Sequence, residues 1–334
     1  MSKILSREIR LASRPKGFPT AASFTLASVE LESLPDQQVL VHNLFMSVDP
    51  YMRGRMNEGK SYVPAFELGK PLEGGAVGEV VESRTKEFKP GDAVVSNFGW
   101  REYFMASPEE LHPVSRNIQP LSVYLGTLGM TGMTAWAGLN LVGVKAGDVI
   151  YISGAAGAVG NVAGQLAKLR GCRVIGSTGS MEKVKFLREE CGFDIAFDYK
   201  TGPVIEQLNV ELPDGIDVYF DNVGGEISDA VIKHINNRGR IVVCGQIALY
   251  NAMDVPMGPR IQPLLLTRSM LMRGFIVSQY QEQFPEGIAE LSKWLAEGKL
   301  KSSETVVEGF EKLPEAFIGL FSGKNIGKMV VKAT

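Results

Sequence analysis

Residues 151–187, YISGAAGAVGNVAGQLAKLRGCRVIGSTGSMEKVKFL, decide the fold of this chain. An apolar run leads into a turn of glycines and alanines, a helix-like run follows, and a second apolar run comes after it. Gly154, Gly157 and Gly160 lie in the turn, where the bare backbone lets a pyrophosphate approach the positive end of the following helix. Ala155 stands at the first position of the G-x-G-x-x-G pattern, and small residues also serve close helix packing. The strand, turn, helix and strand in this order favour a dinucleotide site.

The end of the second apolar run indicates which nicotinamide cofactor the site takes. Enzymes for the unphosphorylated cofactor place a carboxylate there, which binds the ribose 2′-hydroxyl and would repel a 2′-phosphate. Residues 176–180 read Gly-Ser-Thr-Gly-Ser, and Lys183 follows where it can supply positive charge, unless it is an ordinary solvated helix lysine. Tyr199 lies where such a sheet places adenine contacts, although it could equally be a packing residue. The pattern predicts NADPH.

Strands and helices alternate after about residue 126. The strand candidates are residues 148–154, 172–177, 194–199, 215–223, 239–245 and 270–277, and the helix candidates are residues 158–170, 181–192, 204–209 and 226–239. This alternation, with continuously apolar strands, predicts a doubly wound α/β fold, in which helices cover both faces of a parallel sheet. Asn222 follows the fourth strand, at the edge where ligands bind, but an Asn-Gly sequence there can also form an ordinary turn.

The first part of the chain has a different pattern. Short alternating runs separated by glycine and proline predict a β-rich domain before residue 125. From about residue 299 the chain returns to a strand, a short helix and a strand. We therefore expect two domains, a β-rich domain of residues 1–125 that residues 299–334 complete, and a dinucleotide-binding domain of residues 126–298.

Composition argues against several classes of function. The 334 residues carry a formal net charge of -2, so the chain lacks the basic surface that nucleic-acid binding requires. No stretch reaches the ~18 apolar residues of a membrane span, and the amino terminus lacks the apolar block of a secretion signal. Cys172, Cys191 and Cys244 are widely spaced in apolar surroundings, as buried thiols in a reducing compartment are. We expect a cytoplasmic protein without nucleic-acid or membrane partners.

The sequence contains no pattern of metal ligands. Its three histidines are scattered, and neither C-x-x-C nor H-E-x-x-H occurs, so we expect no metal site. No histidine accompanies an activated serine or cysteine, which leaves hydrolase chemistry with little support. Tyrosines are better candidates, because a phenol can donate a hydrogen bond to a developing oxyanion. Tyr51, Tyr62 and Tyr250 occur in polar or glycine-proline contexts, although for each one alone an ordinary surface or core tyrosine is the better-supported interpretation until something places all three together.

Seven segments, in order along nearly the whole chain, resemble the zinc-independent medium-chain dehydrogenase/reductases. Within these the chain is most similar to the branch of prostaglandin reductases, curcumin reductases and plant alkenal double-bond reductases. The segments are DPYMRGRM (49–56), LGMTGMTAWAGL (128–139), SGAAGAVGNVAGQLAKLRGCRVIG (153–176), FDNVGGE (220–226), CGQIALYN (244–251), RGFIV (273–277) and GKNIGKMVV (323–331). Zinc-dependent relatives carry Gly-His-Glu where this chain reads PLEGGAVGEV (71–80), so Glu73 is retained and the histidine is absent.

This resemblance implies a Rossmann domain inserted into a GroES-like β domain, and commonly a homodimer. It also implies a role for each matching residue. The pyrophosphate would be held by Gly157, Ala158, Val159 and Gly160, the 2′-phosphate end by Lys183 and Tyr199, and the middle of the cofactor by Asn222. The nicotinamide and its ribose would be surrounded by Cys244, Gly245, Gln246, Ile247, Ala248, Leu249, Tyr250, Phe275, Ile276, Val277 and Asn325. Tyr250 would touch the substrate carbonyl, and Tyr51 and Tyr62 would line the same pocket.

The activity that the resemblance implies is the NADPH-dependent reduction of the carbon-carbon double bond of α,β-unsaturated ketones and aldehydes. Hydride would pass to the β-carbon, and Tyr250 together with a cofactor ribose hydroxyl would stabilise the enolate. Water or a tyrosine could then protonate the α-carbon. Two alternatives stay open, an NADPH quinone oxidoreductase of the same superfamily and a non-catalytic NADPH-binding protein.

Overall fold

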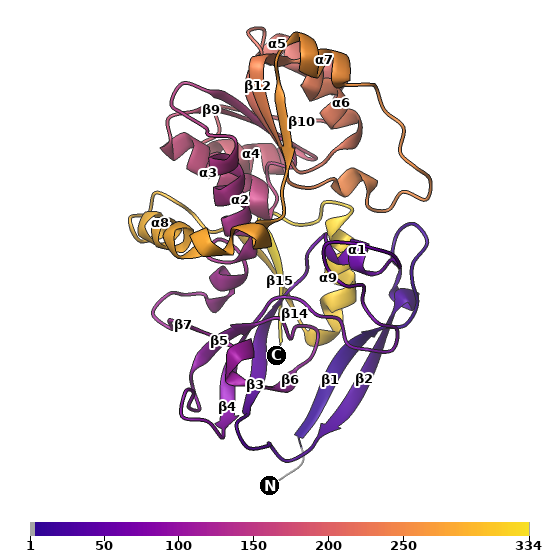
Figure 1. Cartoon of the computed structure of the whole chain (residues 1–334), viewed down its shortest axis with the longest axis vertical. Helices are drawn as coiled ribbons and strands as arrows, with labels where there is room; N and C mark the ends of the chain where they lie inside the picture. The colour runs from indigo at the N-terminus through magenta and orange to yellow at the C-terminus, as the bar shows by residue number, and fades with distance from the viewer. Residues whose placement is uncertain (1–3, 334) are drawn as a thin grey trace. The chain divides into compact units, whose positions relative to one another are not determined.

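The computed structural model describes residues 4–333, which form two compact units, drawn in Figure 1. The first unit contains the chain up to Leu125, the segment Glu304–Asn325 and the chain from Met329. The second unit contains Gly126–Ser303 and the short segment Ile326–Lys328. The chain thus leaves the first unit after Leu125 and returns to it at Glu304, later than the expected residue 299.

The second unit is built on a parallel sheet of six strands in the order β10-β9-β8-β11-β12-β13. The strands are β8 (Val149–Ile152), β9 (Arg173–Thr178), β10 (Ile195–Asp198), β11 (Ile216–Asp221), β12 (Ile235–Val243) and β13 (Leu271–Gly274). Numbered within the unit, this order is 3-2-1-4-5-6, the order of the doubly wound dinucleotide-binding fold. The fold class predicted from the sequence is confirmed.

Helices cover both faces of this sheet. They are α2 (Met130–Leu141), α3 (Ala158–Leu169), α4 (Met181–Glu189), α5 (Val204–Glu211), α6 (Gly225–Lys233), α7 (Gln262–Thr267) and α8 (Phe284–Ala296). On one face, Tyr219 of β11 packs in an apolar cluster with Leu208 of α5 and Val231 of α6. The next residue, Phe220, points to the other face, because side chains alternate along a strand. There its ring lies against Gly138 of α2, where an added Cβ would come within 2.7 Å.

The first unit is rich in β structure. Its strands are β1 (Ile4–Leu11), β2 (Phe24–Leu31), β3 (Val39–Ser47), β4 (Ala76–Ser83), β5 (Ala93–Ser96), β6 (Tyr103–Ala106), β7 (His112–Val114), β14 (Glu304–Glu308) and β15 (Lys328–Lys332), and its helices are α1 (Met52–Arg55) and α9 (Leu313–Leu320). β1 and β2 form an antiparallel pair. The larger sheet has the order β14-β15-β3-β4-β5-β7, and β6 also pairs with β3. The last strand of the chain therefore lies inside this sheet, next to β3.

Several elements differ from the sequence-based expectation. The expected helix 226–239 ends at Lys233, and the chain re-enters the sheet at Ile235, which pairs with Ile216 of β11. The expected strand 270–277 is shorter and ends at Gly274. The sequence analysis did not include helix α8, although its sequence is amphipathic, with one apolar and one polar face. Short-range pattern thus located the central strands but not the ends of the elements around them.

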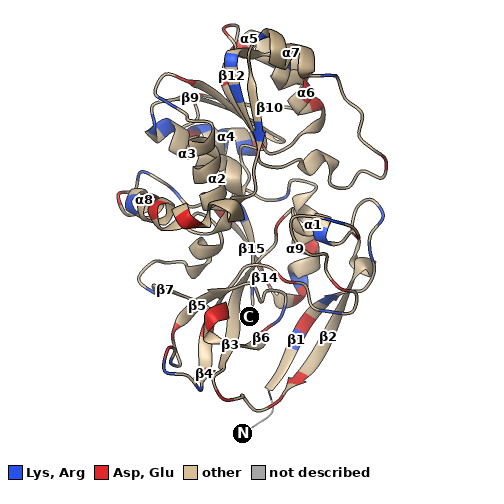
Figure 2. Ribbon diagram, in the orientation of Figure 1, with Lys and Arg blue, Asp and Glu red and all other residues tan. Residues whose placement is uncertain are grey.

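Charged residues of both signs are interspersed along both units, as Figure 2 shows. Among residues 4–333, no helix is long and apolar enough to cross a membrane.

Candidate cofactor and active site

The turn after β8 has the geometry that its glycines predict. Gly154 has a positive φ of 58°, which a residue with a side chain rarely adopts. Gly157 is the N-cap of α3, so the first N–H groups of that helix lack partners within the helix and point out of its end. A Cβ at Gly160 would lie 2.5 Å from the Gly154 oxygen, so this glycine is required for the helix to pack on its own turn. Packing and anion binding therefore both explain the small residues here.

A short stretch near the carboxyl end of the chain lies against this turn. The Gly327 N–H donates to the Ala156 oxygen over 2.8 Å, and Gly157 and Gly327 form a bridge of the β type. Asn325, one of the residues expected near the nicotinamide ribose, precedes this stretch by one residue. The bridge at Gly327 thus brings residues from late in the sequence to the turn after β8 within the second unit, and the expected role of Asn325 stays a prediction.

The end of β9 carries the residues expected at the 2′-phosphate. The Ser180 side chain caps α4 by accepting from the Lys183 N–H, and Lys183 itself is half-buried. Tyr199 lies across the glycine between them, since a Cβ at Gly179 would come within 3.0 Å of the Tyr199 hydroxyl. Ser177 is fully buried, so its hydroxyl is unavailable to a ligand in solvent.

Lys200 is a second cation at this place, and sequence analysis did not single it out. A Cβ at Gly179 would lie 3.3 Å from the Lys200 side chain, and the Lys200 ammonium lies 6.0 Å from the centre of the Tyr199 ring. Burial, followed by the positive charge of Lys200, lowers the pKa of Lys183 below its usual value. The Lys-next-to-Tyr pattern in residues 199–200 was visible in the sequence, but its distance from Lys183 was not.

The strand ends of β11 and β12 meet in a buried polar network. Asn222 donates from its side chain to the Ser153 oxygen over 2.9 Å, which ties the end of β11 to the end of β8. This contact supports the interpretation of Asn222 as a structural turn residue and leaves its expected role at the cofactor as a prediction. The preceding residue, Asp221, is only 1% exposed and accepts hydrogen bonds from several directions. Sequence analysis missed Asp221, although a carboxylate closing an apolar strand was a visible signal.

Tyr250 lies on the turn that follows β12. Its hydroxyl oxygen accepts from the Gln246 N–H over 3.2 Å and passes over Gly245, where a Cβ would lie 3.3 Å away. The phenolic hydrogen is not used in this bond, so it can be donated to a ligand. Burial, with smaller contributions from Cys244 and Asp221, raises the pKa of Tyr250 above its usual value. The group is thus a protonated hydrogen-bond donor at neutral pH.

Two chain segments carry most of the other residues expected around the nicotinamide, namely the turn after β12 and residues 275–277, which follow β13. Cys244, Gly245, Gln246, Ile247 and Leu249 are half-buried and Ala248 is exposed, and all six lie in the turn after β12. Burial raises the pKa of Cys244 to about 12, so it is a thiol and not a thiolate. Phe275 is buried near Gly138 of α2, whereas Ile276 and Val277 are half-buried.

In the first unit, Tyr51 and Tyr62 lie close enough to interact electrostatically. Burial, and then Asp49, raises the pKa of Tyr51, with Tyr62 among the further causes. Tyr51 packs against the apolar core beside α1, while Tyr62 is exposed. Their roles with substrate stay predictions.

The nearby guanidinium of Arg55 pairs with Glu73 at 2.6 Å and donates to the Pro64 oxygen over 2.8 Å. Arg55 also lies 4.0 Å from the centre of the Phe66 ring. The carboxylate that zinc-dependent relatives would place in their Gly-His-Glu segment is therefore engaged by an arginine.

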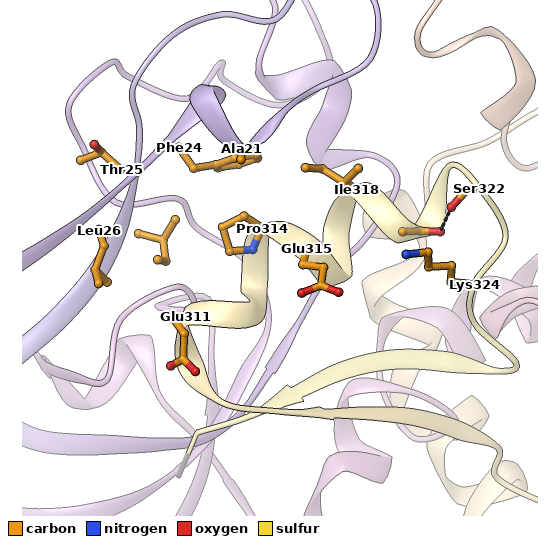
Figure 3. A pocket seen from close by; sticks show the side chains of 12 residues that line it. Ala21, Phe24, Thr25, Leu26, Glu311, Pro314, Glu315, Ile318, Ser322 and Lys324 are labelled. Carbon is orange, nitrogen blue, oxygen red and sulfur yellow. Dashed lines mark hydrogen bonds between the residues drawn. The ribbon is translucent and has the colours of Figure 1, made fainter.

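A cavity of about 490 Å³ lies elsewhere in the first unit, between β2 and α9. Figure 3 shows its wall of Phe24, Leu26, Pro314 and Ile318, with the carboxylates of Glu311 and Glu315 at its edge. It contains none of the residues expected at the site.

We expect the purified protein to contain no stoichiometric zinc and to keep its activity in the presence of a chelator. Among residues 4–333, no three or more histidine, cysteine, aspartate or glutamate side chains cluster so that they could hold a metal ion. Metal analysis by mass spectrometry, followed by assay after chelation, tests this. One tightly bound zinc per chain, with activity lost on its removal, would contradict the prediction.

Two family models match the chain. The model of the N-terminal domain of oxidoreductases matches residues 7–114, and the model of zinc-binding dehydrogenases matches residues 158–293. The NADPH-dependent curcumin reductase of Escherichia coli is 40% identical over 96% of this chain and 95% of its own length. The chain belongs to the medium-chain dehydrogenase/reductase superfamily. It is an oxidoreductase.

Other members of the superfamily also match over nearly the full length of this chain. Prostaglandin reductase 1 of mouse is 44% identical over 95% of this chain and 96% of its own length. The crystal structure of CurA from Vibrio vulnificus in complex with NADPH superposes with a TM-score of 0.94 at 40% identity, covering 98% of this chain and 99% of that one. The branch of the superfamily predicted from the sequence is thus confirmed, including the curcumin and prostaglandin reductases.

Proposed function

We propose that this oxidoreductase uses NADPH to reduce the carbon-carbon double bond of α,β-unsaturated ketones and aldehydes. The observation that carries the proposal is the Tyr250 hydroxyl, held over the Gly245 backbone with its hydrogen available and its pKa raised. The similarity to the NADPH-dependent curcumin reductase and to prostaglandin reductase 1, and the NADPH bound in the CurA crystal structure, support the same cofactor and class of activity.

The residues present fit a phosphorylated dinucleotide. The α3 N-terminus offers N–H groups to the pyrophosphate, and the glycine at position 157 leaves room for it, since a Cβ there would meet only the Gly154 oxygen, at 3.2 Å. Lys183 and Lys200 bring two cations to the end of β9, where no acidic side chain ends the strand. We propose that Lys183, Lys200 and Tyr199 hold the 2′-phosphate.

When bound, NADPH supplies the hydride that is added to the β-carbon of the substrate. As charge gathers on the carbonyl oxygen, Tyr250 donates its hydrogen bond to that oxygen, and the bond strengthens in the transition state. Tyr51 and Tyr62 stay proposed substrate contacts of the first unit.

The test is the loss of NADPH absorbance with a panel of alkenals, aryl enones and quinones. Turnover of the enones, with the saturated ketone or aldehyde identified by mass spectrometry, is the expected result. Rapid quinone reduction with negligible turnover of enones would favour a quinone oxidoreductase. Tight NADPH binding with no oxidation by any acceptor would favour a non-catalytic binding protein.

We also propose that the protein is a homodimer that pairs through the edge of the second unit's sheet. Among residues 4–333, no strand pairs with the outer edge of β13. Large apolar side chains are exposed at Leu271 of that strand, at Leu266 of α7 and, in the segment before α7, at Met253, Val255 and Met257. An open strand edge beside exposed apolar side chains is a typical surface for association, here with a second copy of the chain.

The dimer is tested by a double substitution, Val255→Asp with Leu266→Asp. We expect the protein to change from a dimer to a monomer in light scattering, because two carboxylates would otherwise be buried without partners. Leu5→Asp, at an exposed leucine of β1, is the control and should keep the mass of the wild type. A wild-type monomer, or a double variant that stays dimeric, would overturn the proposed interface.

A further inference from the structure

The carboxylate of Asp221 is buried at the carboxyl end of β11 without an ion-pair partner among the described residues. It is instead surrounded by hydrogen-bond donors. Oδ1 accepts from the Tyr219 hydroxyl at 2.7 Å, the Ser153 hydroxyl at 3.1 Å, the Val223 N–H at 3.1 Å and the Gly224 N–H at 2.9 Å, and Oδ2 accepts from the Ser228 hydroxyl at 3.0 Å and the Gln246 side-chain amide at 2.9 Å. A buried carboxylate satisfied in this way has a fixed position, because any movement leaves several donors unpaired.

These bonds join three segments that are distant in the sequence. Ser153 directly follows β8, Gly224 caps α6 and Ser228 lies in its first turn, and Gln246 lies in the turn after β12. Asp221 also holds that turn through its backbone, since the Cys244 and Gly245 N–H groups donate to its carbonyl oxygen over 2.8 and 3.0 Å. The turn that carries Tyr250 is thus attached to the end of β11 at several points.

Gln246 makes the connection to Tyr250. Its side chain donates to Asp221, and its own backbone N–H donates to the Tyr250 hydroxyl oxygen. Gly224 leaves the space that the Gln246 side chain requires, because a Cβ there would lie 2.1 Å from the Gln246 Oε1 atom. The Asp221 carboxylate and the space over Gly224 therefore fix the position of the Gln246 side-chain amide. Because this amide is fixed, the backbone N–H of Gln246 that bonds Tyr250 is held in position as well.

We infer that Gln246, held by the buried carboxylate of Asp221, is a positioning residue that sets the location of the Tyr250 hydroxyl. The inference rests on the proposed function, in which that hydroxyl donates to the substrate carbonyl. Gln246 acts through Tyr250, so its side chain matters to the chemical step only while the hydroxyl is present. The same bonds also explain two glycines of the FDNVGGE and CGQIALYN segments, which permit the close approach of the two turns.

The test compares Gln246→Leu, Tyr250→Phe and the double variant. Gln246→Leu keeps the backbone N–H and removes the amide that reaches Asp221, so we expect kcat with an enone to fall by about fivefold and the KM for NADPH to change less. In the Tyr250→Phe protein the same substitution should change kcat by less than about twofold, because the group that it positions is absent. A residue that supports only the fold would lower kcat by the same factor in both backgrounds.

Two further variants serve as controls. Gln207→Leu removes a half-buried glutamine amide of α5 that donates to the Gly202 oxygen, and it should leave kcat unchanged. Ser228→Ala removes the other donor to Oδ2 of Asp221 without touching the Tyr250 turn, and a loss equal to that of Gln246→Leu would overturn the inference. Equal losses in the two Tyr250 backgrounds, or no effect of Gln246→Leu in an active enzyme, would also overturn it. If the wild-type enzyme fails to oxidise NADPH in the presence of any of the enones tested, the proposed function itself is refuted.

Discussion

Tyr250→Phe is expected to lower kcat for enones by about tenfold or more, with a smaller change in the affinity for NADPH. The substitution keeps the ring, which packs over Gly245, and removes only the hydroxyl that we assign to the substrate oxygen. A tenfold loss corresponds to ~1.4 kcal/mol of transition-state stabilisation, within the range of one hydrogen bond to a developing charge. Steady-state kinetics with several enones, together with NADPH titration, would measure both quantities.

A pH profile adds a second readout to this prediction. Because burial raises the pKa of Tyr250, the hydroxyl is protonated below that pKa and loses its proton only above it. Wild-type kcat should therefore show no loss attributable to this group until the pH exceeds 10, the ordinary tyrosine value, and Tyr250→Phe should remove any such limb. Tyr124→Phe is the matched control, since the Tyr124 hydroxyl donates only to the Ser115 oxygen in the first unit. Unchanged kcat in Tyr250→Phe across several enones would remove Tyr250 from the mechanism.

Lys183→Ala is expected to weaken NADPH binding by ~1.5–3 kcal/mol, the usual contribution of a hydrogen bond to a charged group. This is roughly a tenfold to hundredfold increase in Kd. The unphosphorylated cofactor has no 2′-phosphate to lose, so its Kd should change little, and the preference for NADPH should collapse while kcat at saturation is kept. Fluorescence titration with both cofactors gives the ratio.

Neighbouring lysines make the cofactor experiment specific. Lys185, two residues further along α4, pairs with Glu189 at 3.8 Å, so Lys185→Ala should leave both affinities unchanged. Lys200→Ala should weaken NADPH selectively, but by less than Lys183→Ala, because Lys200 is exposed and its charge is screened. If Lys183→Ala weakens both cofactors equally, the lysine supports the turn and not the phosphate. If neither affinity changes, the interpretation of Lys183 as a solvated helix lysine would be correct.

The central sheet could be predicted from the sequence because its strands are continuously apolar and its helices are amphipathic. Residues 151–187 alone gave β8, α3, β9 and the start of α4 in their correct order. The end of α6 could not be placed in this way. Residues 234–239 are mostly polar, and only the pairing of Ile235 with Ile216 shows that the strand begins there.

The residues of the candidate site also fall into those that a local sequence motif identifies and those that only the folded structure brings together. Gly157, Lys183 and Tyr250 were selected because each belongs to a local motif, and their roles stay predictions. Asp221 and Lys200 were missed because their importance lies in distances between strand ends that are far apart in the sequence. A carboxylate that meets six donors from three segments has no local signature.

The position of β15 inside the sheet of the first unit has a consequence for biosynthesis. This strand pairs with β3, yet it is synthesised after all six strands of the second unit's sheet. The sheet of the second unit, by contrast, is complete once residue 274 has left the exit tunnel. Domains generally fold as units when their residues become available during synthesis. The second unit can therefore fold on the nascent chain, while the sheet of the first unit stays incomplete, with residues 45–47 of β3 lacking their partners in β15, until residues 328–332 have been added.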